Sequence, residues 1–478
     1  MTLLQRLVIA ALSFIILTTT SRSAEAITYD WDAAADVRFR MWIDVGQEVI
    51  YGVYLIFNES AGDTRVLAER ERIQVWARTV GFAIIGTQFS AEDESEIMQS
   101  DTVLVALENF AEMSGHPEIA NAPLVTDGIS LGGFNSIQFA TIHPERTIAY
   151  AGGAAGRQPA GVTNPAFASV PGLFYHGELD SDVDDALERR DDFLPLRDDG
   201  VEVAFYMQWG VGHDTGNADL IGLKFLADAI YLRYPSDASP VDGPVELIDI
   251  PIEDGWLADY QTWDSPITEI VPYGEAASPN DHFWLPTRDT AYLYRAHATR
   301  PGQVSFAPPL QPDNYTNVDP GGSLALEISV GNLTNVSMVE VFDGSESIAQ
   351  LSDPPYQATW TAEGIGAHSF VAIANLDDGT QRTSDVQPVM VLGTARPGGG
   401  ASPGGGGDDG GDDGSDDGTD DGDGGDDGGG GADGGDGDGD SGCGCRTGGG
   451  DDSLAFALFL AAALAARRFR TRRASRSS

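Results

Sequence analysis

Residues 123–134 read Pro-Leu-Val-Thr-Asp-Gly-Ile-Ser-Leu-Gly-Gly-Phe, and this stretch decides the fold that we expect around it. The apolar residues at its start predict a short buried strand, and the apolar residues after Ser130 recur at helical spacing. The chain therefore turns sharply at Ser130. Gly128 and Gly132 lie on either side of this turn, where a Cβ would clash with neighbouring backbone.

The pattern G-x-S-x-G between a strand and a helix is a nucleophile elbow, which projects the serine hydroxyl away from the sheet edge. A serine hydroxyl attacks poorly until a neighbouring base takes its proton. The helix is expected to begin at Leu131, so its free N–H groups face the place where an oxyanion would form. Ser130 is therefore the first candidate catalytic residue.

Composition excludes several functions. The chain has 478 residues and a formal net charge of −47, with a dense aspartate run near its C-terminus. Binding to nucleic acid is not expected, because phosphate contacts need a basic surface. The two cysteines, Cys443 and Cys445, lie outside any expected core. We therefore expect no disulfide framework, no cysteine-based metal site and no cofactor.

Residues 1–26 have the order of a secretory signal. Arg6 supplies the positive start, residues 7–17 are apolar, and Ala24-Glu25-Ala26 is an A-x-A cleavage site. An uncleaved anchor is the alternative, but the apolar run is short for a membrane span. The sequence therefore predicts export.

Strand-like and helix-like stretches alternate through residues 27–236, the first predicted domain. This alternation predicts a doubly wound, mostly parallel sheet with helices on both faces, whose ligands bind at the carboxyl ends of the strands. The predicted strands cover residues 37–43, 51–57, 82–85, 147–150, 170–175 and 201–206, and the predicted helices cover 65–80, 97–113, 186–196 and 218–231.

In residues 237–310 the helical pattern disappears, and proline, glycine and aromatic residues dominate. This segment is expected to form either a small β module or an extended segment docked on the first domain. Its aromatic residues could stack on sugars, which leaves a polysaccharide surface as a possible partner. A small aromatic core is the favoured interpretation.

Residues 311–393 contain short alternating strands, and Asp378-Gly379 is a hairpin signal. Together they predict a β-sandwich of about seven strands. The runs 339–344, 355–360 and 368–372 resemble the bacterial Ig-like modules that are appended to secreted enzymes. Nothing in this segment has a catalytic pattern.

Residues 394–441 consist almost entirely of glycine and aspartate, so we expect a disordered, solvated linker. Loose binding of Ca²⁺ is the alternative, but the acidic stretches lack the terminal glutamate of an EF-hand loop.

Residues 442–478 contain Cys443 and Cys445, an apolar run over residues 454–466, and an arginine-rich tail. This three-part order resembles the MYXO-CTERM surface-sorting segment. The resemblance implies processing near the cysteines and attachment of the mature protein to the outer cell surface. The alternative is a plain C-terminal membrane anchor, in which the basic tail stays in the cytoplasm.

A serine nucleophile needs a base and a carboxylate that orients the base. After Ser130, a carboxylate is available in residues 170–183, where a buried strand ends in His-Gly-Glu-Leu-Asp-Ser-Asp. The base candidate is in residues 209–214, which read Trp-Gly-Val-Gly-His-Asp and again follow a strand. Three loops after three strands thus supply serine, acid and histidine in one order, at one sheet edge.

At this point residues 51–231 resemble a compact α/β-hydrolase of the secreted esterase, depolymerase and prolyl-oligopeptidase kind. The resemblance implies that Ser130 is the nucleophile, Asp180 the acid and His213 the base, with Asp182 as the alternative acid. His176 would be a structural residue at a strand end, because it precedes the acid in the chain.

The resemblance also implies an oxyanion hole built from the N–H of Leu131 and an N–H of the loop after the strand at 51–57. That family usually has His-Gly in this loop, whereas this chain has Asn58-Glu59-Ser60-Ala61-Gly62. By position, Ser60 would supply the second N–H. Glu59 is an unusual neighbour, since a carboxylate opposes a developing negative charge unless it points to solvent.

The sequence therefore predicts an extracellular serine hydrolase that cleaves carboxylic esters through an acyl-enzyme, with polymeric esters as candidate substrates. Its expected partners are an ester or polymer substrate and the cell envelope. A serine peptidase of similar fold is one alternative. A non-catalytic surface protein that adheres or binds carbohydrate is the other. The segment between Ala151 and Val170 is short, which predicts a site without a large lid.

Overall fold

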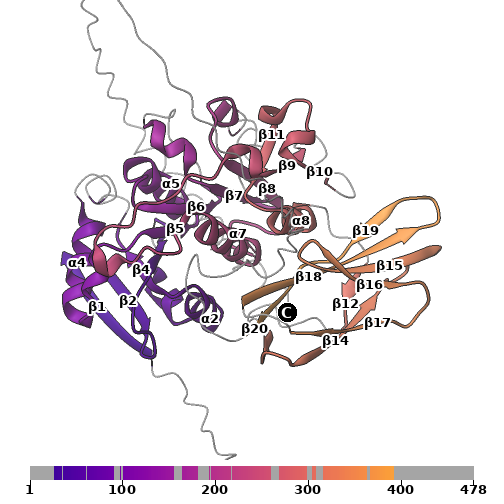
Figure 1. The fold of residues 1–478 in the computed structure, drawn as a ribbon, viewed down its shortest axis with the longest axis horizontal. Helices are drawn as coiled ribbons and strands as arrows, with labels where there is room; N and C mark the ends of the chain where they lie inside the picture. The colour runs from indigo at the N-terminus through magenta and orange to yellow at the C-terminus, as the bar shows by residue number, and fades with distance from the viewer. Residues whose placement is uncertain are drawn as a thin grey trace, which may run out of the picture. The chain divides into compact units, whose positions relative to one another are not determined.

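The fold is described from a computed structural model, shown in Figure 1. It describes residues 26–391 except 35, 61, 91–96, 98–100, 156–163, 181–192, 194, 217, 260–267, 299–303, 308–315 and 363–365. The predicted signal, linker and sorting segment, together with Asp182, Cys443 and Cys445, lie outside these residues.

An eight-stranded sheet forms the centre of the first domain, in the order β1-β2-β4-β3-β5-β6-β7-β8. The first two strands pair antiparallel with each other, and β2 pairs antiparallel with β4. From β4 through β3 to β8, all neighbours are parallel. The strands are β1 (Ala26–Ala34), β2 (Val37–Asp44), β3 (Gly52–Phe57), β4 (Phe82–Gln88), β5 (Leu124–Gly128), β6 (Thr147–Gly153), β7 (Gly172–Gly177) and β8 (Val203–Gln208).

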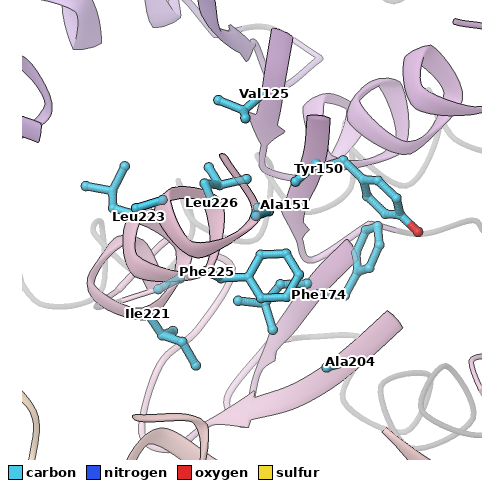
Figure 2. Packing of buried hydrophobic residues seen from close by; sticks show 14 of the residues in the cluster. Val125, Tyr150, Ala151, Phe174, Ala204, Ile221, Leu223, Phe225 and Leu226 are labelled. Carbon is cyan, nitrogen blue, oxygen red and sulfur yellow. The ribbon is translucent and has the colours of Figure 1, made fainter. Parts of the chain in front are cut away.

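Helices cover both faces of this sheet, which confirms the predicted α/β architecture. On one face, Tyr54 and Val125 pack with apolar residues of α2 (Glu71–Val80) and α7 (Ala218–Arg233). On the other face, Val53 and Leu55 pack with α4 (Thr102–Ser114). Figure 2 shows side chains of α7 packed toward residues of four parallel strands, which are Val125, Ala151, Phe174 and Ala204.

Two predicted helices have different bounds in the structure. The helix predicted over 65–80 is divided into a 3-10 helix, η1 (Thr64–Glu69), and α2, because Arg70 between them is extended at φ −71° and ψ 121°. In the segment predicted as one helix over 97–113, Ile97 is helical, and α4 begins separately at Thr102. Asp101 before it has a left-handed backbone with φ 53°, which interrupts a regular helix.

The prediction that residues 237–310 lack helix is wrong. They contain a small antiparallel sheet of β9 (Trp256–Asp259), β10 (Ile270–Pro272) and β11 (His282–Leu285), followed by α8 (Arg288–Ala298). The Tyr294 hydroxyl of α8 donates to Phe205 O of β8 at 2.5 Å. Trp284 and Tyr294 are fully buried, so these two aromatic rings belong to core packing.

The C-terminal described residues form a β-sandwich. One sheet contains β12 (Ser305–Phe306), β14 (Ser323–Ser329) and β17 (Tyr356–Thr361). The other contains β13 (Thr316–Val318), β20 (Gln387–Val391), β18 (Gly366–Leu376), β15 (Val336–Asp343) and β16 (Glu346–Leu351), with β19 (Gln381–Thr383) paired to β18. The described part of the sandwich has nine strands, against the seven predicted, and β12 lies before residue 311, the predicted start of this domain.

The predicted hairpin at Asp378-Gly379 joins β18 to β19, and Gly379 has φ 84°, a conformation that favours glycine. None of the described helices is long and apolar enough to cross a membrane.

Candidate active site

The elbow has the strained geometry that its sequence predicts. Ser130 lies between β5 and α5 (Leu131–Ile142) with φ 59° and ψ −121°, a positive φ that non-glycine residues rarely adopt. Its N–H donates to Gly153 O of β6 at 2.7 Å. A Cβ on Gly128 would lie only 2.4 Å from the Gly132 carbonyl carbon. The two glycines therefore permit the close approach that forces Ser130 outward.

The predicted acid and base meet at the same edge of the sheet. Asp180 follows β7, and His213 follows β8, its parallel neighbour. His213 Nδ1 lies 2.7 Å from Asp180 Oδ2. The Asp180 side chain has no exposed surface, whereas 41% of the His213 side chain is exposed. A buried carboxylate thus contacts one nitrogen of an imidazole ring that is partly exposed to solvent.

Backbone contacts hold the two loops together. Leu179 N–H donates to Val211 O at 2.7 Å, and a Cβ on Gly177 would lie 2.2 Å from Gly212 O. His176, at the end of β7, is buried, and its Nε2 lies 3.7 Å from the same Asp180 oxygen that His213 contacts. His176 thus lies behind the carboxylate at the strand end, which fits the structural role expected for it.

Two segments meet where the oxyanion hole is predicted, the start of α5 and the loop after β3. Leu131 is the first residue of α5, and first-turn N–H groups have no acceptor within their own helix. The start of the loop after β3 packs closely against the first turn of α5, since a Cβ on Gly132 would lie 2.4 Å from Phe57 O. Glu59 and Ser60 are both exposed. The assignment of the second donor to Ser60 stays a prediction.

Asn58 anchors the start of this loop. It is fully buried, and its side-chain amide donates to Phe89 O and to Glu59 O at 2.8 Å each. Its side-chain oxygen accepts from Phe89 N–H and from the Thr87 hydroxyl. The residue that replaces the usual histidine therefore links the end of β3 to the end of β4.

A cavity of about 60 Å³ adjoins the elbow, between the sheet and the start of α7. Gly128 and Ile129, directly before Ser130, line it on one side, and Thr215, two residues after His213, lines it on the other. The same cavity therefore borders the loops that carry the serine and the histidine.

A carboxylate that the sequence analysis did not single out faces this cavity. Asp127, at the end of β5, accepts the Tyr54 hydroxyl at 2.7 Å and the Gly128 N–H at 2.7 Å. Burial raises the pKa of Asp127 to about 6, although both hydrogen bonds act to lower it. The signal in the sequence was an aspartate at the end of an apolar strand, one residue before the elbow glycine.

Comparisons with known proteins found one family match and several similar solved structures. Residues 310–382 match the family described as bacterial Ig domain. Among solved structures, a ferulic acid esterase is 15% identical, covers 43% of this chain and 98% of its own, and has a TM-score of 0.34. The S-formylglutathione hydrolase of Staphylococcus aureus is 13% identical, with coverages of 44% and 98% and a TM-score of 0.32.

The fibronectin(III)-like modules of Clostridium thermocellum CbhA are 31% identical over 18% of this chain, with a TM-score of 0.17. The match covers 45% of that chain. No curated protein matches the sequence. The strand order, the elbow and the Ig-domain match together identify the chain as an α/β-hydrolase-fold protein that carries a bacterial Ig domain.

Proposed function

We propose that the protein is a serine hydrolase that cleaves carboxylic esters through an acyl-enzyme. The observation that carries this proposal is the hydrogen bond between His213 and the fully buried Asp180, at the sheet edge where the elbow presents Ser130. A structural histidine and aspartate would not need a strained serine nearby, whereas acyl transfer needs all three groups.

In the proposed mechanism, His213 Nε2 takes the proton of the Ser130 hydroxyl as the oxygen attacks the ester carbonyl. Asp180 accepts the Nδ1–H, which selects the tautomer with a free Nε2 and stabilises the imidazolium. The protonated His213 then gives its proton to the leaving alcohol, and an acyl-Ser130 ester remains. Water attacks this ester with His213 again as base, which releases the acid and restores the serine.

The N–H of Leu131 is proposed to stabilise the oxyanion, together with an N–H from the loop that Asn58 anchors. Glu59 in that loop is exposed, so water can screen its charge from the reacting carbonyl. The departure from the usual loop sequence is therefore compatible with the reaction.

Labelling with a fluorophosphonate tests whether the protein is an enzyme at all. Folded wild-type protein is expected to label, and Ser130→Ala and His213→Ala are expected to abolish or strongly slow labelling. Circular dichroism of each variant controls for folding. No labelling of a folded wild type would favour a non-catalytic adhesive or carbohydrate-binding protein.

The substrate class is tested with aryl esters of increasing acyl length, polymeric esters and peptide amides. Hydrolysis of esters with negligible amide cleavage is expected. Faster cleavage of peptide amides than of matched esters would instead identify a serine peptidase.

We further propose that the protein acts outside the cell, attached to the outer surface through residues 442–478. The order of a signal-like start, two folded parts, a Gly/Asp-rich segment and a Cys/apolar/Arg end supports this location. Deletion of residues 442–478 is expected to move the protein from the cell surface to the medium, measured by surface proteolysis and blotting. Intracellular retention of the full chain would contradict the proposal.

A further inference from the structure

We propose that the cavity beside Ser130 binds the acyl chain of the substrate, and that Asp127 selects an acyl chain with a hydrogen-bond donor at its far end. This inference rests on the proposed esterase function, and it names the substrate class of that same site. The class is a short aliphatic acyl group that ends in a hydroxyl or an ammonium.

The walls of the cavity are mostly apolar. Tyr54 and Ile56 of β3 and Leu173 of β7 line it from the sheet, and Ile73 of α2 and Gly222 of α7 line it from the helices. The Trp76 indole N–H donates to Leu223 O at 2.8 Å, which ties α2 to α7. Because both walls are held by packed elements, the cavity is a preformed space that suits an aliphatic chain.

Gly222 provides a separate indication that this space is kept open. It lies inside α7 and is buried, yet a Cβ built on it would have no heavy atom within 4 Å. Glycine within a helix destabilises it by about 1 kcal/mol relative to alanine. No steric clash at this position requires glycine. We therefore infer that Gly222 keeps the cavity open for a ligand, since a larger side chain would enter it.

Asp127 has unused acceptor capacity. An ionised carboxylate can accept about four hydrogen bonds, and the described part of the chain supplies Asp127 with two, from Tyr54 and Gly128. Among the residues that the structure describes, no cation forms an ion pair with Asp127. Arg72 of α2 is paired with Asp219 of α7. The carboxylate is half-buried and lines the cavity, so a donor on a ligand can reach it.

The size of the cavity limits the length of the chain. A water-sized group occupies about 10–15 Å³ of such a volume, so 60 Å³ admits about four to six non-hydrogen atoms. An acyl chain of up to six atoms therefore fits the cavity, and its terminal donor must reach Asp127 on the β5 wall, next to Gly128.

The acyl side fits this partly open cavity better than the alcohol side. The leaving alcohol takes its proton from His213, whose side chain is 41% exposed, so the alcohol departs toward solvent. The acyl group stays bonded to Ser130 beside Gly128 and Ile129, which line the cavity. Its chain is therefore the part that the cavity can hold through the whole reaction.

Three p-nitrophenyl esters of equal length test the selection: heptanoate, 6-hydroxyhexanoate and 6-aminohexanoate. Wild type is expected to prefer at least one of the two donor-ended esters over heptanoate by about tenfold or more in kcat/KM, since hydrogen bonds to charged groups are strong. Asp127→Asn is expected to remove the preference for the ammonium ester, because the amide carries no charge. Asp237→Asn, an exposed aspartate beyond α7, is the matched control and should keep the wild-type preference.

Gly222→Leu tests the position of the chain independently of Asp127. The new side chain enters the cavity, so kcat/KM for the six-atom acyl esters should fall at least tenfold more than for acetate, and Gly222→Ala should lie between. A matched series in which the alcohol is lengthened instead should not show this pattern. If only that alcohol series responds, the cavity holds the leaving group and the acyl assignment is overturned.

The outcomes separate the two proposals. If wild type labels at Ser130 and cleaves acetate but shows neither a donor preference nor a response to Gly222→Leu, the inference fails and the esterase function stands. If wild type neither labels nor cleaves any ester, both fail. Thermal unfolding of each variant shows whether a lost preference reflects misfolding.

Discussion

Gly132→Ala is the perturbation whose effect the structure defines most closely. A Cβ at this position would lie 2.4 Å from Phe57 O, 2.9 Å from Phe57 C and 3.1 Å from Asn58 O. Ordinary contact begins at 3.4 Å, so the first of these contacts is short by about 1 Å. All three atoms are backbone, at the start of the loop that is proposed to complete the oxyanion hole. Either this loop or the first turn of α5 must move.

A displacement of about 1 Å at a reacting centre can lower the rate by about a hundredfold. We therefore expect Gly132→Ala to reduce kcat for p-nitrophenyl acetate by about two orders of magnitude, with a smaller change in KM. Overpacking of this kind typically destabilises a fold by about 1–3 kcal/mol. Urea unfolding followed by tryptophan fluorescence measures that part.

The same substitution at Gly222 is the matched control for stability. Both glycines lie in helices, but a Cβ on Gly222 meets nothing within 4 Å. Gly222→Ala is therefore expected to leave the fold unchanged or to stabilise it by about 0.5–1 kcal/mol. Wild-type kcat in Gly132→Ala, together with wild-type stability, would refute the assignment of the close approach between the elbow and the β3 loop.

Three further predictions concern other parts of the molecule. Asp180→Asn is expected to lower kcat by about 10³–10⁴-fold without loss of fold, because an amide favours the wrong tautomer of His213. The rate at which Ser130 is labelled, followed before steady state, measures the loss of nucleophile activation. The pKa of Asp127 in the folded protein lies above its ordinary value, so the folded state binds this proton more tightly than the unfolded state does. The free energy of unfolding should therefore fall as pH rises from about 4 to about 6. Asp127→Asn should remove that decline, up to about 3 kcal/mol, in urea titrations compared across this pH range. Arg233→Ala should destabilise the fold by about 2–4 kcal/mol, since it leaves two buried β6 carbonyls without their guanidinium donor. Urea unfolding measures the loss, and the folded variant should still be labelled at Ser130 by the fluorophosphonate.

The parallel strands of the sheet were predictable because each is a short apolar run bounded by turn residues. Helix boundaries were harder to predict from the sequence. The extended backbone at Arg70 has no counterpart in local composition, and arginine is a good helix former. Helix α8 was missed for a related reason. Its buried positions include Thr290, whose hydroxyl donates to Asp228 of α7 at 2.6 Å, and such a partner is invisible in the linear pattern.

The site divides in the same way. The contact between Asp180 and His213 was predictable, because the order of elements places the ends of adjacent parallel strands together. The cavity could not be predicted from the sequence, because Asp127 and Gly222 are brought to the same cavity only by the packing of α7 against the sheet. A lone aspartate in a strand and a lone glycine in a helix are individually ordinary.

The energetics of Asp127 connect this cavity to the stability of the fold. Burial raises the pKa of Asp127, so ionisation of this carboxylate makes the folded state less stable at neutral pH than it is at about pH 4. A helical glycine at position 222 adds a second unfavourable choice on the opposite wall. Two independent local losses of stability face one space beside the nucleophile. Residues that lower stability in this way are typical of sites where function requires them. If Asp127→Asn and Gly222→Ala both stabilise the protein and both impair turnover of donor-ended esters, the stability deficit and the substrate preference have the same origin.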